Sequence, residues 1–137
     1  MEFIQNKDDE ILIVGNGCSV LEYNFGKEID AFPVVGRINN YSTKKYENYI
    51  GNKTDIWFNG ANQNLRKRAD KPEKIIVSIP LEILQRKGEK IHAQIQRRLN
   101  LDIDQYTLIP AGMMQTIERK LNANRPTTGT TAILWAL

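Results

Sequence analysis

Three asparagines follow predicted strands at comparable places, and they are the residues of this sequence best suited to hold a polar ligand. Asn16 lies in the first strand-to-helix turn, Asn39 follows the second strand and Asn59 ends the third. A side-chain amide presents donors and an acceptor without charge, which suits a pyrimidine edge or sugar hydroxyls. Asparagine also favours strand ends because it tolerates the left-handed backbone region. This preference for turns explains each asparagine well by itself, but it explains less well why all three strand ends carry asparagine.

The segment ILIVGNGCSV, residues 11–20, brings an apolar run to a turn that contains two glycines. Gly15 and Gly17 allow positive φ angles and the close approach of a phosphate or a ribose. Ser19 can cap the helix that follows. An ordinary strand-to-helix turn accounts for the same residues equally well. A dinucleotide site needs a third glycine where Val20 stands and an acidic residue after the second strand, so a nicotinamide or flavin cofactor is disfavoured.

Hydroxyl residues open the last predicted helix, directly after Pro126. They and the glycine among them are Thr127, Thr128, Gly129 and Thr130. The free amides and hydroxyls of such a helix start can hold a carboxylate or a phosphate. Plain helix capping explains the same residues equally well. The apolar stretch 132–137 that follows looks cut short, so we expect either a fragment or a surface that a partner covers.

Other residues whose side chains could bind a ligand or take part in catalysis have simpler explanations. Arg37, near the end of the second predicted strand, can contact a ligand or pair with a carboxylate such as Asp30 or Asp55, and pairing is slightly favoured. His92, the only histidine, lies beside an apolar stripe on a predicted helix, so we interpret it as a surface or boundary residue. With Cys18 as the only cysteine, neither an intramolecular disulfide nor a metal cluster is expected.

Short β-branched runs alternate with amphipathic segments, as in parallel sheets whose strands are joined by crossover helices. Strands are predicted at Ile11–Val14, Pro33–Ile38, Thr54–Asn59, Lys74–Ile79 and Tyr106–Ile109. Helices are predicted at Leu21–Glu28, Thr43–Tyr49, Asn62–Ala69, Leu81–Asn100 with a break at Gly88, Met113–Ala123 and from Ala132 onward. The expected fold is α/β: a Rossmann-like, doubly wound, mostly parallel sheet of about five strands flanked by helices, in one domain over residues 1–137.

The composition limits the classes of partner. Hydrophobic residues make up 41% and charged residues 26% of the 137 positions, and the formal charge of +3 favours anionic ligands only weakly. Basic residues gather at 64–74 and 85–98 without interleaved aromatic residues, so no nucleic acid partner is expected. No apolar run approaches the ~20 residues of a membrane helix, and no targeting segment is evident. We expect a cytoplasmic protein, with peripheral contact to the inner face of the membrane left open.

Four segments resemble, in order, the motifs of the sialyltransferases. IVGNGCSVLEY, DAFPVVGRINNY and IGNKTDIWFNGANQ are closest to the short bacterial type, which has a Gly-Asn-Gly turn, an Arg-x-Asn after the second strand and an Asn after the third. RPTTGTTAILWAL resembles the small sialyl motif of the animal-type family, glycosyltransferase family 29. The resemblance covers residues 11–62 and 125–137.

This resemblance implies a donor site for CMP-sialic acid or a related CMP-sugar, with a glycan as acceptor and no separate cofactor. Carried over by motif, residues 15–17 would line the phosphate and ribose region. Asn39 and Asn59 would lie near the donor phosphate and sugar, and the hydroxyls and amides of residues 127–130 would complete the site.

The sequence also departs from the family pattern. The family places a general-base histidine downstream of the small motif, and this chain ends before that point. The animal-type family links its two motifs by a disulfide for which Cys18 has no partner, so a bacterial or phage-like cytosolic form is the consistent interpretation. We therefore expect a donor-binding part, truncated at its C-terminus, that binds nucleotide without turnover. The alternative is a noncatalytic nucleotide-binding or assembly module that associates with its own copy through the apolar C-terminal end.

Overall fold

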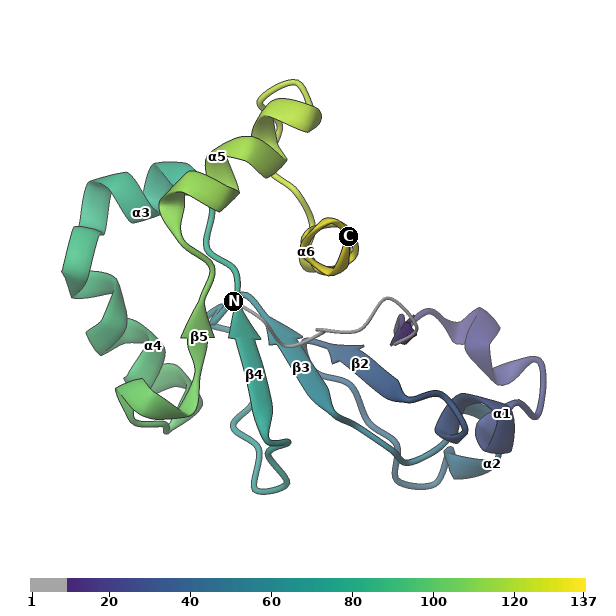
Figure 1. Ribbon diagram of the computed structural model, residues 1–137. Helices are drawn as coiled ribbons and strands as arrows, with labels where there is room; N and C mark the ends of the chain where they lie inside the picture. Colours follow the sequence, from purple (N-terminus) through teal and green to yellow (C-terminus); the bar gives the residue numbers. More distant parts are fainter. Residues whose placement is uncertain (1–9) are drawn as a thin grey trace.

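Five parallel strands form one sheet in the computed structural model, which describes residues 10–137 (Figure 1). The strands lie side by side in the order in which they occur in the chain, and every neighbouring pair is parallel. Each lies within a range predicted from a β-branched run, so the five strands and the parallel α/β class are confirmed. Their bounds are β1 (Ile11–Val14), β2 (Val34–Ile38), β3 (Ile56–Asn59), β4 (Lys74–Val77) and β5 (Thr107–Leu108).

The centre of the sheet is buried on both faces, which explains why β3 begins with three large apolar residues. All four residues of β3 are buried. Because side chains alternate along a strand, Trp57 and Phe58 point to opposite faces. The ring of Phe58 meets that of Trp135 edge to face, with centroids 5.4 Å apart. The ring of Trp57 instead lies 5.7 Å from the guanidinium of Arg68, which belongs to the loop between β3 and β4.

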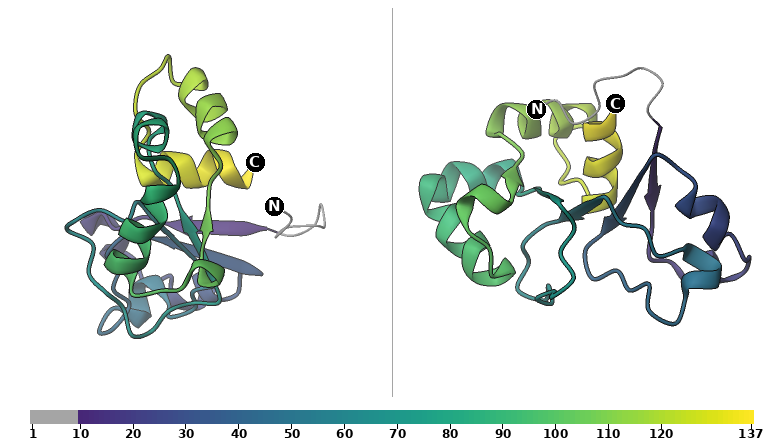
Figure 2. Two further views of the ribbon diagram at one scale, coloured as in Figure 1. Left: turned by 90° about the vertical axis from the view of Figure 1, so that its left-hand side faces the viewer. Right: turned by 60° about the horizontal axis from the view of Figure 1, so that its bottom comes forward.

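Helices flank the sheet in two groups with a single helix between them. In Figure 1, α1 and α2 pack together near β2, whereas α3, α4 and α5 gather beyond β4 and β5. Between these groups, α6 contacts both β1 and β3 (Figure 2). Within residues 10–137, no helix combines the length and the apolar character needed to cross a bilayer. The bounds are α1 (Gly26–Asp30), α2 (Glu47–Ile50), α3 (Leu81–Lys87), α4 (Ile91–Leu99), α5 (Ala111–Lys120) and α6 (Thr128–Ala136).

Glycines end two helices where the sequence predicts a stop. Gly51 follows α2 with a φ of 71°, and Gly88 separates α3 from α4 with a φ of 54°. Positive φ carries little steric cost for glycine, so both positions suit a helix end. The predicted break at Gly88 is confirmed. The helix predicted at Thr43–Tyr49 is present only in its second half, and the one predicted at Leu21–Glu28 is replaced by a 3-10 turn and α1.

The helix predicted at Asn62–Ala69 is wrong, because these residues form a loop. We call residues 61–73, which join β3 to β4, the crossover loop. Leu65 is its only large aliphatic residue between Ala61 and Asp70, so no apolar stripe at helical spacing can bury itself against the sheet. Bonds from outside hold the loop: Nη1 of Arg98 donates to the carbonyl of Ala61 at 2.7 Å.

Candidate functional site

The carboxyl ends of β2, β3 and β4 form a continuous hydrogen-bonded edge. The backbone amide of Asn39 donates to the carbonyl of Phe58 at 2.8 Å, and that of Ser78 donates to the carbonyl of Asn59 at 2.9 Å. Nε1 of Trp57 donates to the carbonyl of Asn39, also at 2.8 Å. The backbone around Asn39 and Ser78 is therefore fixed at the edge of a parallel sheet where ligands commonly bind.

The N-terminus of α6 adds free backbone amides to this edge. Thr127 is the N-cap residue, and its Oγ1 accepts a hydrogen bond from the amide of Thr130 at 3.1 Å. The amide of Thr131 donates to the carbonyl of Thr127 at 3.0 Å. These bonds leave the amides of Thr128 and Gly129 for an acceptor outside the helix. Because the helix dipole places partial positive charge at this end, an anion is the favoured acceptor.

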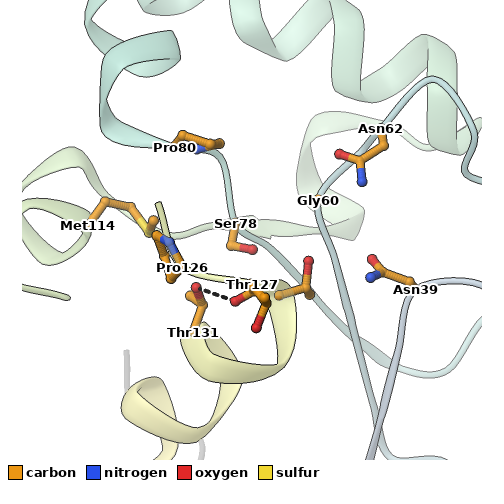
Figure 3. Close-up of a pocket in the computed structure, with 10 residues that line it drawn as sticks. Asn39, Gly60, Asn62, Ser78, Pro80, Met114, Pro126, Thr127 and Thr131 are labelled. Carbon is orange, nitrogen blue, oxygen red and sulfur yellow. Dashed lines mark hydrogen bonds between the residues drawn. The ribbon is translucent and has the colours of Figure 1, made fainter. Parts of the chain in front are cut away.

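A cavity of about 310 Å³ lies between the strand ends and the start of α6, and we call it the amide cleft (Figure 3). Figure 3 shows Asn39 and Asn62 on one side and Met114 and Pro126 on the other, with Ser78 between them. Of the described residues that line the cleft, none is charged. Recognition there depends on neutral amides and hydroxyls. The lining residues are Asn39, Gly60, Asn62, Ser78, Pro80, Met114, Pro126, Thr127, Thr128 and Thr131.

Two side-chain amide atoms at this edge are buried without a hydrogen-bond partner among the described residues. They are Oδ1 of Asn39 and Nδ2 of Asn59. The other amide atom of Asn59, its Oδ1, accepts from the backbone amide of Ala61 at 3.0 Å. An unsatisfied buried polar group costs about 1–3 kcal/mol. A ligand that donates to Asn39 Oδ1 would remove that cost, so the cleft matches a ligand with hydroxyl or amino donors.

A second cavity, of about 260 Å³, is lined by the turn after β1 and by the residues after β2, and we call it the turn cleft. Nδ2 of Asn16 donates to the carbonyl of Ile38 at 2.8 Å, one residue before Asn39. The turn predicted to bind ligand therefore lies next to the amide cleft and lines a neighbouring cavity. The lining residues are Gly15, Asn16, Gly17, Cys18, Val20, Leu21, Asn40, Tyr41, Ser42, Tyr46 and Ile50.

The three asparagines that the sequence singles out lie at one edge of the sheet in three different environments. Asn39 lines the amide cleft, Asn16 lines the turn cleft, and Asn59 is fully buried. Only Asn39 shares a cavity with the predicted hydroxyl residues Thr127 and Thr128.

Three further predicted residues lie outside both clefts. Thr130 Oγ1 accepts from Thr127 Oγ1 at 2.9 Å, within the first turn of α6. Gly129 lies against β2, where an added Cβ would be 3.3 Å from Cδ1 of Ile38. Ser19 is inside a 3-10 turn whose N-cap residue, Gly17, supplies no side-chain bond, so the prediction that Ser19 caps a helix is wrong.

Arg37 is 1% exposed and lines neither cleft. Its Nε donates to the carbonyl of Lys53 and to Oγ1 of Thr54, both at 3.0 Å, and its Nη2 donates to the carbonyl of Ile50 at 2.9 Å. Burial lowers the pKa of Arg37, and the charge of Asp30 opposes that shift. The sequence slightly favours an internal partner for Arg37 over a ligand, and this geometry agrees with that alternative. The hydrogen-bond partners are neutral oxygen atoms, however, and not the expected carboxylate.

Most residues that line the amide cleft were not predicted as site residues, and Ser78, Asn62 and Met114 are three of them. The predicted strand continues through Ser78 because Ile79 is apolar, whereas β4 ends at Val77. Ser78 therefore directly follows a strand, and a polar residue in that position is the signal that could have identified it. Asn62 is hidden by the wrong helix prediction, and Met114 reaches the cleft from α5 without any polar signal.

His92 lines neither cleft and is 23% exposed, so its interpretation as a boundary residue is confirmed. Its Nδ1 lies 2.6 Å from Oη of Tyr106. Burial raises the pKa of the Tyr106 phenol. Among residues 10–137, no three His, Cys, Asp or Glu side chains gather closely enough to hold a metal ion.

Comparison with known proteins gives both a family and a fold. The family model described as glycosyltransferase family 29 (sialyltransferase) matches residues 6–137. The curated beta-1,6-galactosyltransferase GALT29A of Arabidopsis thaliana is 38% identical over 50 residues, which are 36% of this chain and 13% of that protein.

Two solved structures share the fold at low sequence identity. A mammalian sialyltransferase in complex with Gal-beta-1-3GalNAc-ortho-nitrophenol has a TM-score of 0.68 and 19% identity, covering 92% of this chain and 50% of that one. Another crystal structure of a mammalian sialyltransferase has a TM-score of 0.67 and 19% identity, covering 92% and 49%. The chain thus spans about half the length of these proteins. Their α/β architecture agrees with the sheet described above.

Proposed function

This chain belongs to glycosyltransferase family 29, the sialyltransferase family, and from that membership we propose that its amide cleft binds a CMP-sugar donor. The donor class is CMP-sialic acid or a related CMP-sugar, and the acceptor is a glycan. The observation that supports this choice is the uncharged lining of the cleft beside the free amides of α6. Cys18 is exposed and unpaired, which suits a reducing compartment, so a cytoplasmic location is part of the proposal.

The number of phosphate groups in the donor distinguishes the nucleotide-sugar classes. A CMP-sugar carries a single phosphodiester with one negative charge, which the amide of the cleft residue Thr128 can hold at the helix N-terminus. A UDP-sugar carries a diphosphate, which proteins often bind through a divalent cation held by carboxylates or through basic side chains. The described lining of the amide cleft has neither. The geometry therefore supports a monophosphate donor, although the plant relative is named a galactosyltransferase.

The two ends of the cleft suit the two ends of a nucleotide. Asn39 lines one side of the cleft, and its side-chain amide suits a ribose hydroxyl or a cytosine amino group. On the other side, Pro80, Met114 and Pro126 offer apolar surface to a ring. The adjoining turn cleft, with its two glycines, leaves room for a further part of the donor.

Calorimetric titration of the chain with CMP, UDP and NAD tests the proposal. CMP is expected to bind without added divalent cation and at least about tenfold more tightly than UDP, a difference of about 1.4 kcal/mol. Binding of NAD but not CMP, or binding of UDP alone in the presence of Mn²⁺, would contradict it.

A second candidate function, an assembly module, is favoured by an exposed apolar residue of α6. Ile133 is 54% exposed. A second copy of the chain that covers it would bury this surface. Light scattering distinguishes the candidates: a dimer that Ile133→Ser converts to a monomer supports assembly, and a monomer that binds CMP counts against it.

A further inference from the structure

Asn40 directly follows the cleft residue Asn39, and both polar atoms of its side-chain amide form hydrogen bonds to the crossover loop. Its Nδ2 donates to the carbonyl of Asn64 at 3.1 Å. Its Oδ1 accepts from the backbone amide of Arg66 at 2.8 Å. One side chain thus bonds to the backbone of the loop on both sides of Leu65, as a neighbouring strand would.

Arg68 joins the same two segments a second time. Its Nη1 donates to the carbonyl of Tyr41 at 2.6 Å, and its guanidinium carbon lies 3.6 Å from the centroid of the Tyr41 ring. Its side chain is only 13% exposed, so the contact is largely shielded from solvent. Cation–π contacts strengthen when they are desolvated. We call the contacts of Asn40 and Arg68 together the loop clamp.

The loop clamp connects two neighbouring segments on one side of the amide cleft (Figure 3). The segment after β2 contributes Asn39 to the cleft, and the start of the crossover loop contributes Asn62. Apart from the bond of Arg98 to the carbonyl of Ala61, few contacts hold this part of the loop, since all of residues 62–70 are exposed or half-buried. Segments with few buried apolar contacts open easily unless polar bonds hold them.

We propose that Asn40 and Arg68 are positioning residues for ligand binding in the amide cleft. They line no part of that cleft themselves; they fix the crossover loop against the segment after β2, and thereby hold Asn62 at a constant distance from Asn39. The inference rests on the proposed function only for the identity of the ligand used as probe, which is CMP.

The role differs from a general contribution to stability because Asn40 is exposed. Replacing it by alanine leaves the carbonyl of Asn64 and the amide of Arg66 in reach of water, so no buried group loses its partner. The sheet and its helices should therefore persist while the loop loosens.

Limited digestion with trypsin measures how readily the loop opens, because residues 66–68 are three consecutive basic residues at which trypsin can cut. Asn40→Ala is expected to speed cleavage there about fivefold or more, since open states of a loop are the ones that are cut. Asn64→Ala is the matched control: that residue gives the clamp only its backbone carbonyl, so cleavage should match the wild type. Arg68→Lys keeps a trypsin site but loses the planar guanidinium, and should behave like Asn40→Ala.

Calorimetry with CMP on the same variants tests the effect on binding. Asn40→Ala and Arg68→Lys are expected to weaken CMP binding about tenfold, with Asn64→Ala unchanged. Equal cleavage rates in Asn40→Ala and wild type would overturn the clamp, and faster cleavage with unaltered CMP affinity would overturn its positioning role. If the wild type binds no CMP, the proposed function fails, and the cleavage rates alone decide whether the clamp exists.

Discussion

Replacing Asn39 by aspartate is expected to weaken CMP binding about a hundredfold, or about 2.7 kcal/mol, and to leave the fold intact. Asn39 has a φ of 50°, a conformation that aspartate also tolerates, and the two side chains have the same size. The new carboxylate would stand in an uncharged cleft opposite the incoming phosphate. Two like charges about 4–8 Å apart repel by about 2–4 kcal/mol at an effective dielectric of about 20, a range that includes the predicted loss.

Asn62→Asp provides the matched control for this prediction. Asn62 lines the same cleft, but its side chain is exposed, so water and salt screen the added charge. Its effect on CMP affinity should stay at about tenfold, well below that of Asn39→Asp. Calorimetry at low and moderate salt measures both variants, and circular dichroism checks their fold. Equal losses in the two variants would show that Asn39 has no special place in the site.

Replacing Trp57 by alanine is expected to destabilise the protein by about 3–5 kcal/mol, the range for removing a buried aromatic side chain. Trp57 has no exposed surface, and its Nε1 holds the carbonyl of Asn39 at 2.8 Å. Domains of this size have total stabilities of about 5–15 kcal/mol, so the alanine variant loses a large share.

Trp57→Phe separates packing from hydrogen bonding at this position. The phenyl ring retains much of the buried apolar surface but cannot donate to the carbonyl of Asn39, which should cost about 1–3 kcal/mol. Urea denaturation followed by circular dichroism measures all three proteins. A phenylalanine variant as stable as the wild type would refute a structural role for this bond.

The fold was predictable where a run of residues carries its own signal. The β-branched residues of Ile11–Val14 and Lys74–Val77 identify strands because buried parallel strands are apolar on both faces. The crossover loop was not predictable in this way. Its order comes from Arg68 and Arg98, which donate to carbonyls far away in the sequence, and no local pattern reveals such bonds.

The candidate site was predictable in part for the same reason. Residue type identified Asn39, Thr127 and Thr128, because polar groups at strand ends and helix starts have a local explanation. Residue type could not distinguish Asn39 from Asn40. Oδ1 of Asn39 has no hydrogen-bond partner in the described part of the chain, whereas both polar atoms of the Asn40 amide bond to the crossover loop. Only the neighbours that the fold supplies decide which amide remains available.

The order of pairing in the sheet also bears on how the protein is made. Each strand pairs with the strand that follows it in the chain, so the sheet can assemble progressively while the chain leaves the ribosome. The exception is α6, the last described helix, which returns to contact β1, the first described strand. A nascent chain therefore has a paired sheet before α6 reaches it and completes the wall of the amide cleft.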